Sequence, residues 1–249
     1  MANWSDPRIG ASQPGTTTTV GQDVAFDAGL RSHMLSVYNY MTSGVLLTGI
    51  VALLFAQGGE NSLAFRLFVG GGPLVVWAAI LAPLGVVMWL NFGINRISTG
   101  TARILFWVYA GLLGVSLSTI FFVYTAGSIA TAFFATAAGF ASLSLWGYTT
   151  KRDLSGMGTF LIMGLFGLIV AMLINVFMQS PAMDLAISAI GVLIFAGLTA
   201  YDTQKIKSLY FAVAGTDFHG KAVVMGALTL YLDFINLFLF LLRFMGNRN

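Results

Sequence analysis

Residues 222–242 read AVVMGALTLYLDFINLFLFLL, an apolar run that is interrupted by one acidic residue, Asp233. A bilayer core of about 30 Å takes about 20 helical residues to cross, so this run is long enough to span a membrane. A carboxylate at that depth costs about 3 kcal/mol on insertion scales, and such residues in membrane proteins usually mark functional sites. The run therefore predicts a transmembrane helix with a functional carboxyl group near its middle.

The rest of the chain has the same apolar character. Of its 249 residues, 57% are hydrophobic and 8% are charged, whereas soluble domains carry about 25% charged residues. We therefore expect an all-α integral membrane protein with seven transmembrane helices, which would place the two termini on opposite sides. The other spans are expected within residues 35–59, 67–95, 104–150 (two spans, with a turn at 124–128), 154–183 and from 185 to beyond 201.

The N-terminal region differs from the spans. Residues 1–19 lack the basic and apolar regions of a signal peptide, and their Gly, Ser, Thr and Pro content predicts a disordered tail. Apolar side chains then recur at helical spacing at Phe26, Leu30, Met34 and Val37. This pattern fits either an amphipathic segment at the membrane interface or an extension of the first helix. We divide the chain into a cytoplasmic tail with this lead-in, residues 1–33, and a seven-helix domain, residues 34–249.

The distribution of Lys and Arg predicts the orientation, because cytoplasmic loops carry the excess of these residues. With the N-terminus inside, nine of the twelve fall on the cytoplasmic side: Arg8, Arg31, Arg96, Arg103, Lys151, Arg152, Lys205, Lys207 and Lys221. We expect a multi-pass cell-membrane protein with a cytoplasmic N-terminus and the C-terminus on the opposite side. The basic pI of about 9.3 then reflects topology and anionic lipid headgroups, not nucleic-acid binding. The absence of cysteine excludes disulfides and thiolate metal sites.

Two aspartates are predicted to meet inside the bundle. Steps of three and four place Thr229, Asp233 and Asn236 on one face of the last helix, so that face should turn inward. Asp202 follows the sixth apolar run, and the midpoint between it and Asp233 falls in the turn at residues 215–220. Residues equally distant from the turn of an antiparallel pair lie level, provided that the sixth helix continues past Tyr201. Two carboxyls in one low-dielectric site titrate as a unit and supply hard oxygen ligands, which makes the pair a candidate proton sensor and calcium site.

Other roles for these residues stay open. Asp202 can be a surface carboxylate paired with Lys205, and Asp233 can form a structural hydrogen bond to Asn175 or Ser142. Arg96 lies on the same predicted side as Asp202 and can either latch that carboxylate or serve as a positive-inside anchor. The two histidines, at positions 33 and 219, are too few and too far apart in the sequence to indicate a metal site, and we expect no cofactor.

Several segments together resemble the Bax inhibitor-1 (transmembrane Bax-inhibitor-motif) family. They are residues 96–98 (RIS), 110–121 (AGLLGVSLSTIF), 147–154 (GYTTKRDL), 200–207 (AYDTQKIK) and 231–238 (YLDFINLF). The resemblance implies a bundle whose last helix is central and wrapped by the other six. It also implies a pH-sensitive calcium leak, with a diaspartyl sensor at Asp202 and Asp233 and an arginine latch at Arg96. The short C-terminus, without a lysine-rich tail, is similar to bacterial members, so we expect a bacterial inner membrane.

Two other functions compete with the leak channel. Intramembrane aspartyl proteases also use a Tyr-Asp pair, as at Tyr201-Asp202, but the second aspartate of that family follows Gly-x-Gly, and here residues 230–232 are Leu-Tyr-Leu. We therefore expect no enzyme activity. A non-conducting regulator of a membrane-bound protease or another membrane partner is the alternative. The expected partners are the lipid bilayer and calcium ions, and not nucleic acid.

Overall fold

The computed structural model describes residues 17–247, with side chains from residue 28 onward. Its long helices are α1 (Thr17–Ala56), α3 (Gly72–Gly93), α4 (Thr99–Leu117), α6 (Ala126–Thr149), α7 (Ser155–Met178), α8 (Pro181–Val213) and α9 (His219–Met245). Short helical turns join them: η1 (Gly59–Asn61), α2 (Leu63–Phe65), η2 (Arg66–Gly70) and α5 (Ile120–Val123). No strand occurs between residues 17 and 247.

Within residues 17–247, seven helices are long and apolar enough to cross a membrane, which confirms the predicted all-α membrane fold. Large apolar side chains cover the outside of the bundle; Leu74 and Phe177, for example, are 85% and 88% exposed. Such a surface is stable only in contact with lipid or another apolar partner. The long uncharged run at 104–150 forms two spans as expected, because α5 ends at Val123 and the Thr125 side chain accepts a hydrogen bond from Ser128 N to cap α6.

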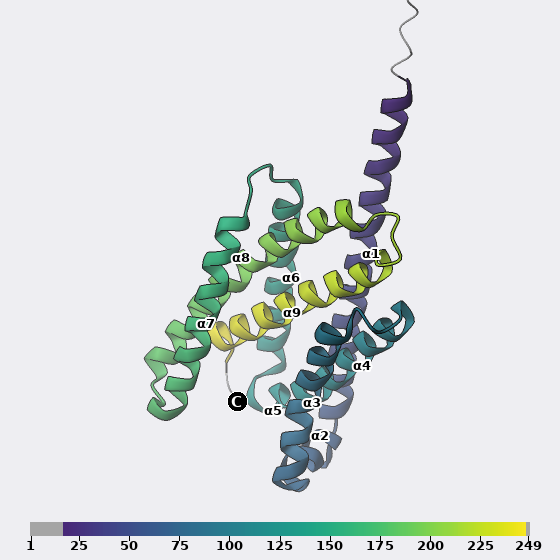
Figure 1. Ribbon diagram of the computed structural model, residues 1–249. Helices are drawn as coiled ribbons and strands as arrows, with labels where there is room; N and C mark the ends of the chain where they lie inside the picture. The colour runs from purple at the N-terminus through teal and green to yellow at the C-terminus, as the bar shows by residue number, and fades with distance from the viewer. Residues whose placement is uncertain (1–16, 248–249) are drawn as a thin grey trace, which may run out of the picture.

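The N-terminal part of α1 is one continuous helix (Figure 1). Of the predicted disordered tail, residues 1–16 lie outside the described part of the chain, and residues 17–19 belong to α1. Leu30, Met34 and Val37 are buried in the main apolar core. This part of the lead-in is therefore an extension of the first helix that packs into the bundle, and the side chain of Phe26 lies outside the described residues.

The last helix, α9, is the most buried span. In its most apolar stretch 72% of the residues are buried, compared with 11% for both α3 and α7. It packs against α8, α1, α6 and α4, and it crosses the middle of the molecule in Figure 1. That all six other spans surround it stays a prediction.

A hydrogen-bonded tyrosine joins α9 to α1 and α4. Thr48 Oγ1 donates to the carbonyl oxygen of Ala110 at 2.8 Å and lies 2.6 Å from Tyr231 Oη. A hydroxyl has one proton to donate, so Tyr231 must be the donor in the second contact. Tyr231 is fully buried, and the rings of Phe106 and Tyr109 meet it edge to face. The hydrogen-bonded phenol of Tyr231 thereby holds α1, α4 and α9 in register.

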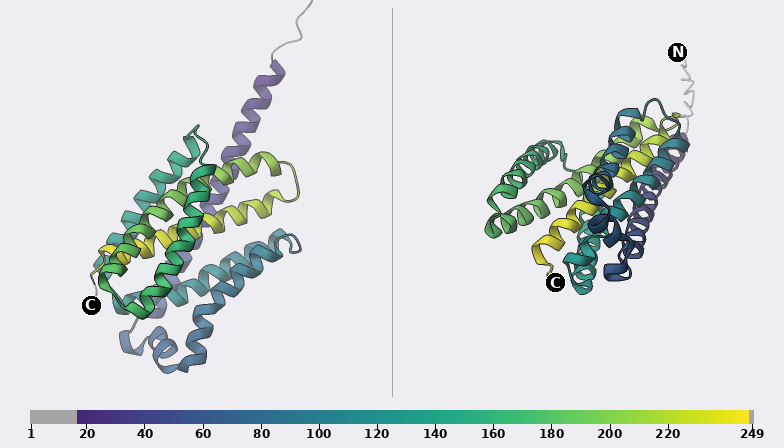
Figure 2. Two further views of the ribbon diagram at one scale, coloured as in Figure 1. Left: turned by 60° about the vertical axis from the view of Figure 1, so that its left-hand side comes forward. Right: turned by 90° about the horizontal axis from the view of Figure 1, so that it is seen from below.

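The hairpin of α8 and α9 positions the candidate site. Helix α8 continues to Val213, well past Tyr201, as level pairing of the two aspartates requires. The two helices run antiparallel, joined by a short turn that contains Gly215 with φ of 77° (Figure 2). Close approach to α6 holds α8 in place, because Gly147 packs directly on the backbone of Ala200.

Candidate functional site

Asp202 and Asp233 are brought together in the interior of the bundle. Their exposed fractions are 9% and 5%. Both line one cavity of about 490 Å³ between α7, α8 and α9, where each carboxyl is close enough to affect the charge of the other. The structure thus places two acidic side chains from adjacent helices in one shared, mostly apolar space.

The local sequence explains why both carboxyls turn inward. On α8, Ser188, Thr199 and Thr203 are fully buried, and Asp202 is 9% exposed. The hydroxyls of all three donate to backbone carbonyls of their own helix, so these positions add no unsatisfied donors. The helix can therefore bury these positions without a large desolvation cost, which allows α8 to lie in the interior where Asp202 is also buried.

The predicted polar face of α9 also lines the cavity. Thr229 and Asn236 lie there with Asp233, one turn to either side of it. Thr229 Oγ1 donates to Met225 O at 3.0 Å, and Asn236 Nδ2 donates to Leu232 O at 2.8 Å. The amide oxygen of Asn236 and the hydroxyl oxygen of Thr229 keep acceptor capacity, so this wall presents oxygen atoms to whatever enters the cavity.

The rest of the cavity wall is apolar, with one cation among its residues. The lining comprises Ile162, Leu165, Leu168, Ile169 and Met172 from α7, Phe195, Leu198, Tyr201, Asp202 and Lys205 from α8, and Thr229, Leu232, Asp233, Asn236 and Phe240 from α9. Lys205 is exposed, and its charge acts on Asp202 without forming an ion pair within 4 Å. Asp233 Oδ2 is buried and has no hydrogen-bond donor among the described residues.

The structural partners considered for Asp233 are engaged elsewhere. Asn175 Oδ1 accepts from Ser180 N at 3.1 Å, and Ser142 Oγ donates to Ala138 O at 2.9 Å. Neither reaches the aspartate pair. A buried carboxyl oxygen without a partner is expensive, so its retention needs an explanation other than helix packing.

Arg96 is not part of this arrangement. It lies in the turn between α3 and α4, where its backbone nitrogen donates to Gly93 O at 2.8 Å. Its side chain is exposed, and it forms no ion pair with Asp202 in the described part of the chain. The predicted contact between Arg96 and Asp202 is therefore not formed in the structure.

Two features escaped the sequence reasoning. One is a hydroxyl row of Tyr38, Ser144 and Thr203, which joins α1, α6 and α8 with oxygen-to-oxygen distances of 2.6 and 2.8 Å. Thr203 gives its proton to Thr199 O, so Ser144 donates to Thr203 and Tyr38 donates to Ser144. The row ends beside Asp202. No spacing in the sequence indicates it, because its members come from three distant segments.

The second missed feature is a contact between the two histidines of the chain. His33 Nδ1 and His219 Nε2 are 3.1 Å apart, a contact that the sequence analysis did not predict. Their separation of 186 residues gave no hint that α1 passes the start of α9. No group of three or more His, Cys, Asp or Glu side chains suited to hold a metal ion occurs among the residues described.

Comparisons with known proteins give the family. A family model described as "Inhibitor of apoptosis-promoting Bax1" matches residues 30–249. The chain belongs to the Bax inhibitor-1 family. It is 49% identical over 234 residues to "Uncharacterized protein RP147" of Rickettsia prowazekii, covering 94% of this chain and 97% of that protein. It is 47% identical over 223 residues to "Inner membrane protein YbhL" of Escherichia coli (strain K12), covering 89% of this chain and 94% of that protein. This multi-pass membrane protein is therefore similar to these relatives over nearly their whole length.

Proposed function

We propose that this protein is a pH-sensitive calcium leak channel in which Asp202 and Asp233 are both the proton sensor and the cation site. The observation that carries the proposal is the cavity that both buried carboxyls line, where one carboxyl oxygen has no donor among the described residues. Such a pair is costly to bury, and buried ionisable groups in membrane spans line ion and proton pathways more often than they stabilise a fold. The site therefore fits transport better than packing.

Proton and calcium would compete for the same oxygens. Two carboxylates offer up to four oxygen ligands, and Thr229 and Asn236 lie on the same wall. Calcium takes six to eight oxygens, so waters would complete the shell and the ion would remain loosely held, as a permeant ion must be. Protonation of the pair removes the charge that attracts the ion. Cation passage would then depend on pH without any further sensor.

The proposed latch requires a second conformation. Arg96 would move from its exposed position to pair with Asp202, since a guanidinium matches a carboxylate geometrically. Helix α3 is one of the two least buried spans, which makes displacement of its end inexpensive. Latched and unlatched states need to differ by only a few kcal/mol for pH to shift their populations.

The proposed location is a bacterial inner membrane with a cytoplasmic N-terminus. The relative in Escherichia coli is named as an inner membrane protein, and most Lys and Arg residues fall on the side assigned to the cytoplasm. No peptidase activity is proposed, because Leu230 and Leu232 stand where an intramembrane aspartyl protease needs glycine.

Calcium-indicator liposomes test the proposal directly. Wild type, Asp202→Asn, Asp233→Asn and Asp217→Asn are reconstituted and assayed from pH 5 to 8. Asp217 is exposed and outside the cavity, so its variant is the matched control. We expect wild type and Asp217→Asn to leak with the same pH dependence, and Asp202→Asn and Asp233→Asn to lose that dependence.

The same assay distinguishes the alternative function. If no variant leaks at any pH although all are inserted, the protein is better described as a non-conducting regulator of a membrane-bound protease or another membrane partner. If Asp233→Asn leaks with the pH profile of wild type, the aspartate pair is not the sensor.

A further inference from the structure

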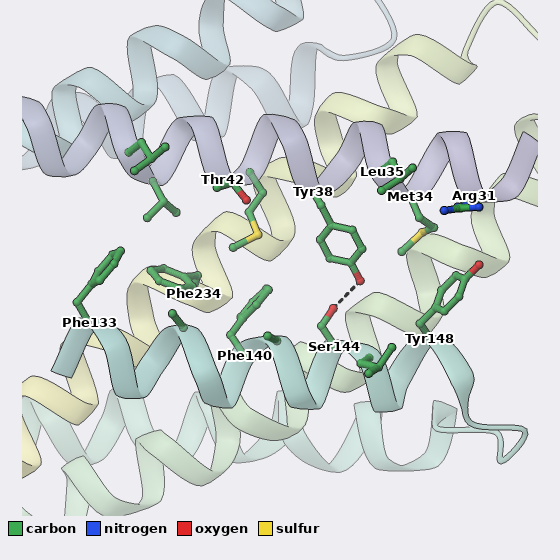
Figure 3. Close-up of a pocket in the computed structure, with 16 residues that line it drawn as sticks. Arg31, Met34, Leu35, Tyr38, Thr42, Phe133, Phe140, Ser144, Tyr148 and Phe234 are labelled. Atoms are coloured by element: carbon green, nitrogen blue, oxygen red, sulfur yellow. Dashed lines mark hydrogen bonds between the residues drawn. The ribbon is translucent and has the colours of Figure 1, made fainter. Parts of the chain in front are cut away.

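A second, larger cavity lies on a different face of the bundle. It is a groove of about 630 Å³ between α1 and α6, with Phe234 of α9 at its floor (Figure 3). Its lining residues are Arg31, Met34, Leu35, Tyr38, Met41, Thr42, Val45, Leu46, Phe133, Ala137, Phe140, Ala141, Ser144, Leu145, Tyr148 and Phe234. This volume is within the range of about 300–1,000 Å³ typical of small-molecule sites. None of these residues lines the aspartate cavity.

The long middle of the groove is apolar. Its walls are mostly Met, Leu, Val, Ala and Phe side chains, with the hydroxyl of Thr42 among them, and the polar Tyr38 and Ser144 face each other across it. The Tyr38 proton is committed to Ser144, and the Ser144 proton is committed to Thr203. These two hydroxyls therefore have no proton to offer a ligand, and the middle of the groove suits a hydrocarbon.

One end of the groove is basic. Arg31 and Tyr148 lie together there, away from Phe133 at the other end (Figure 3). Arg31 is exposed and forms no hydrogen bond or ion pair with any residue whose side chain is described. Lys207 Nζ lies 2.8 Å from Tyr148 O and 4.9 Å from the centre of its ring, which adds a second positive charge close by. A guanidinium favours a phosphate, which it can bind in a bidentate manner.

The length of the groove matches one lipid leaflet. The α1 residues that line it run from Arg31 to Leu46. At a rise of about 1.5 Å per residue, this stretch covers roughly 22 Å along the helix. Half of a hydrocarbon core is about 15 Å, so the groove reaches from the headgroup region to the bilayer centre. An acyl chain that lies along it can have its phosphate at the basic end.

We propose that this groove binds an acyl chain of an anionic phospholipid, with the phosphate of the lipid held by Arg31. The basic end and the apolar middle of the groove follow one another as the phosphate and the acyl chain do in such a lipid. The basic end is also on the side with most Lys and Arg residues. The site is separate from the aspartate cavity, so it does not depend on the proposed leak activity.

Native mass spectrometry of the full-length protein in detergent tests the proposal with dioleoyl phosphatidylglycerol and dioleoyl phosphatidylcholine as probes. Wild type should bind the anionic lipid more tightly. Arg31→Gln should weaken phosphatidylglycerol binding about tenfold, the loss expected for one charge-assisted hydrogen bond. It should weaken phosphatidylcholine binding less, because the choline cation of that lipid already offsets the charge of its phosphate. Arg152→Gln is the charge control, because Arg152 is an exposed residue just after α6 that does not line the groove.

A second set of variants fills the groove. Ala141 and Ala138 are both exposed on α6, but only Ala141 lines the groove. Ala141→Trp should abolish tight binding of both lipids, whereas Ala138→Trp should bind like wild type. Thr42→Leu narrows the groove from α1 and provides an independent variant if Ala141→Trp does not fold.

Three outcomes would overturn the lipid site. One is equal binding of the two lipids by wild type. Another is loss of the preference in Arg152→Gln but not in Arg31→Gln. The third is retention of tight lipid binding by both groove-filling variants. The same result is expected if the groove is the binding site for a helix of another membrane protein and the lipids bind elsewhere.

Discussion

His33 Nδ1 lies 3.1 Å from His219 Nε2 and joins α1 to the first residue of α9. His33 is 1% exposed, and the ring of Tyr210 from α8 packs against both imidazoles. Helices α1, α8 and α9 are therefore connected at one end by a small aromatic cluster. A neutral imidazole can donate from one nitrogen and accept at the other, so this contact needs only one correctly placed proton.

A double-mutant cycle should detect this contact. We expect His33→Ala and His219→Ala each to lower stability, and the double variant to lose about 1 kcal/mol less than the sum of the two, because the second substitution removes a partner already lost. Unfolding in detergent measures the three values against wild type. Strict additivity would mean that the two rings contribute through packing alone.

Gly147 should not tolerate a methyl group. A Cβ at this position would lie 2.9 Å from Ala200 Cα and still closer to its carbonyl oxygen, and both are backbone atoms that cannot rotate away. Gly147→Ala is expected to cost about 1–3 kcal/mol by forcing α6 and α8 apart. A Cβ added at Gly139 on the same helix would have no neighbour within 4 Å, so Gly139→Ala should be neutral or stabilising through helix propensity. Equal effects of the two variants on the unfolding midpoint would contradict this account.

Substituting Tyr231 and substituting Thr48 should lower the stability by unequal amounts. Tyr231→Phe removes one donor, and Thr48 keeps its bond to Ala110 O, so the expected loss is about 1 kcal/mol. Thr48→Val removes the acceptor and leaves a fully buried phenol unsatisfied, with an expected loss of about 1–3 kcal/mol. Comparing both variants by unfolding in detergent checks the order. A larger loss in Tyr231→Phe would show that the donor assignment is wrong.

Asp153, in the loop between α6 and α7, should titrate below its ordinary range. Hydrogen bonds from the side chain and backbone of Ser155 lower the pKa of this exposed carboxyl from its usual 3.8, and Ser155 N lies 2.9 Å from Asp153 Oδ1. A carboxyl whose pKa is lowered on folding stabilises the fold above its unfolded pKa, and this contribution is lost as pH falls through the folded pKa. Carboxyl-carbon NMR titration should give a midpoint below 3.8 that rises in Ser155→Ala. A midpoint that does not move in Ser155→Ala would exclude the side-chain hydrogen bond as a cause.

The spans and the aspartate pair were predictable because their signals are local. Charge-free runs longer than about 20 residues define membrane helices without reference to the rest of the fold. The pairing of Asp202 with Asp233 required only the position of one turn, since the two residues belong to consecutive helices. The continuation of α8 past Tyr201 was the uncertain step, because Lys205 and Lys207 interrupt the apolar pattern there. Lys207 is accommodated by its hydrogen bond to Tyr148 O.

The remaining features depend on which helices are neighbours, and this information is not local. Arg96 and Asp202 share a predicted side of the membrane, but the sequence does not say that α3 packs chiefly on α4 and away from the aspartate cavity. The His33–His219 contact and the groove between α1 and α6 could not be predicted for the same reason, because both depend on which helices are neighbours. Helix neighbours are decided by the summed packing of many side chains, and no single motif reports them.

The hydroxyl row of Tyr38, Ser144 and Thr203 has one further consequence. Every proton in it points toward α8, and the last one is given to Thr199 O, a peptide carbonyl that has no proton to pass on. A relay of hydroxyls conducts only if each oxygen can receive a proton on one side and release another on the opposite side. The row therefore does not conduct protons. Protons at the lipid-facing surface of α1 cannot reach the two aspartate carboxyls through it.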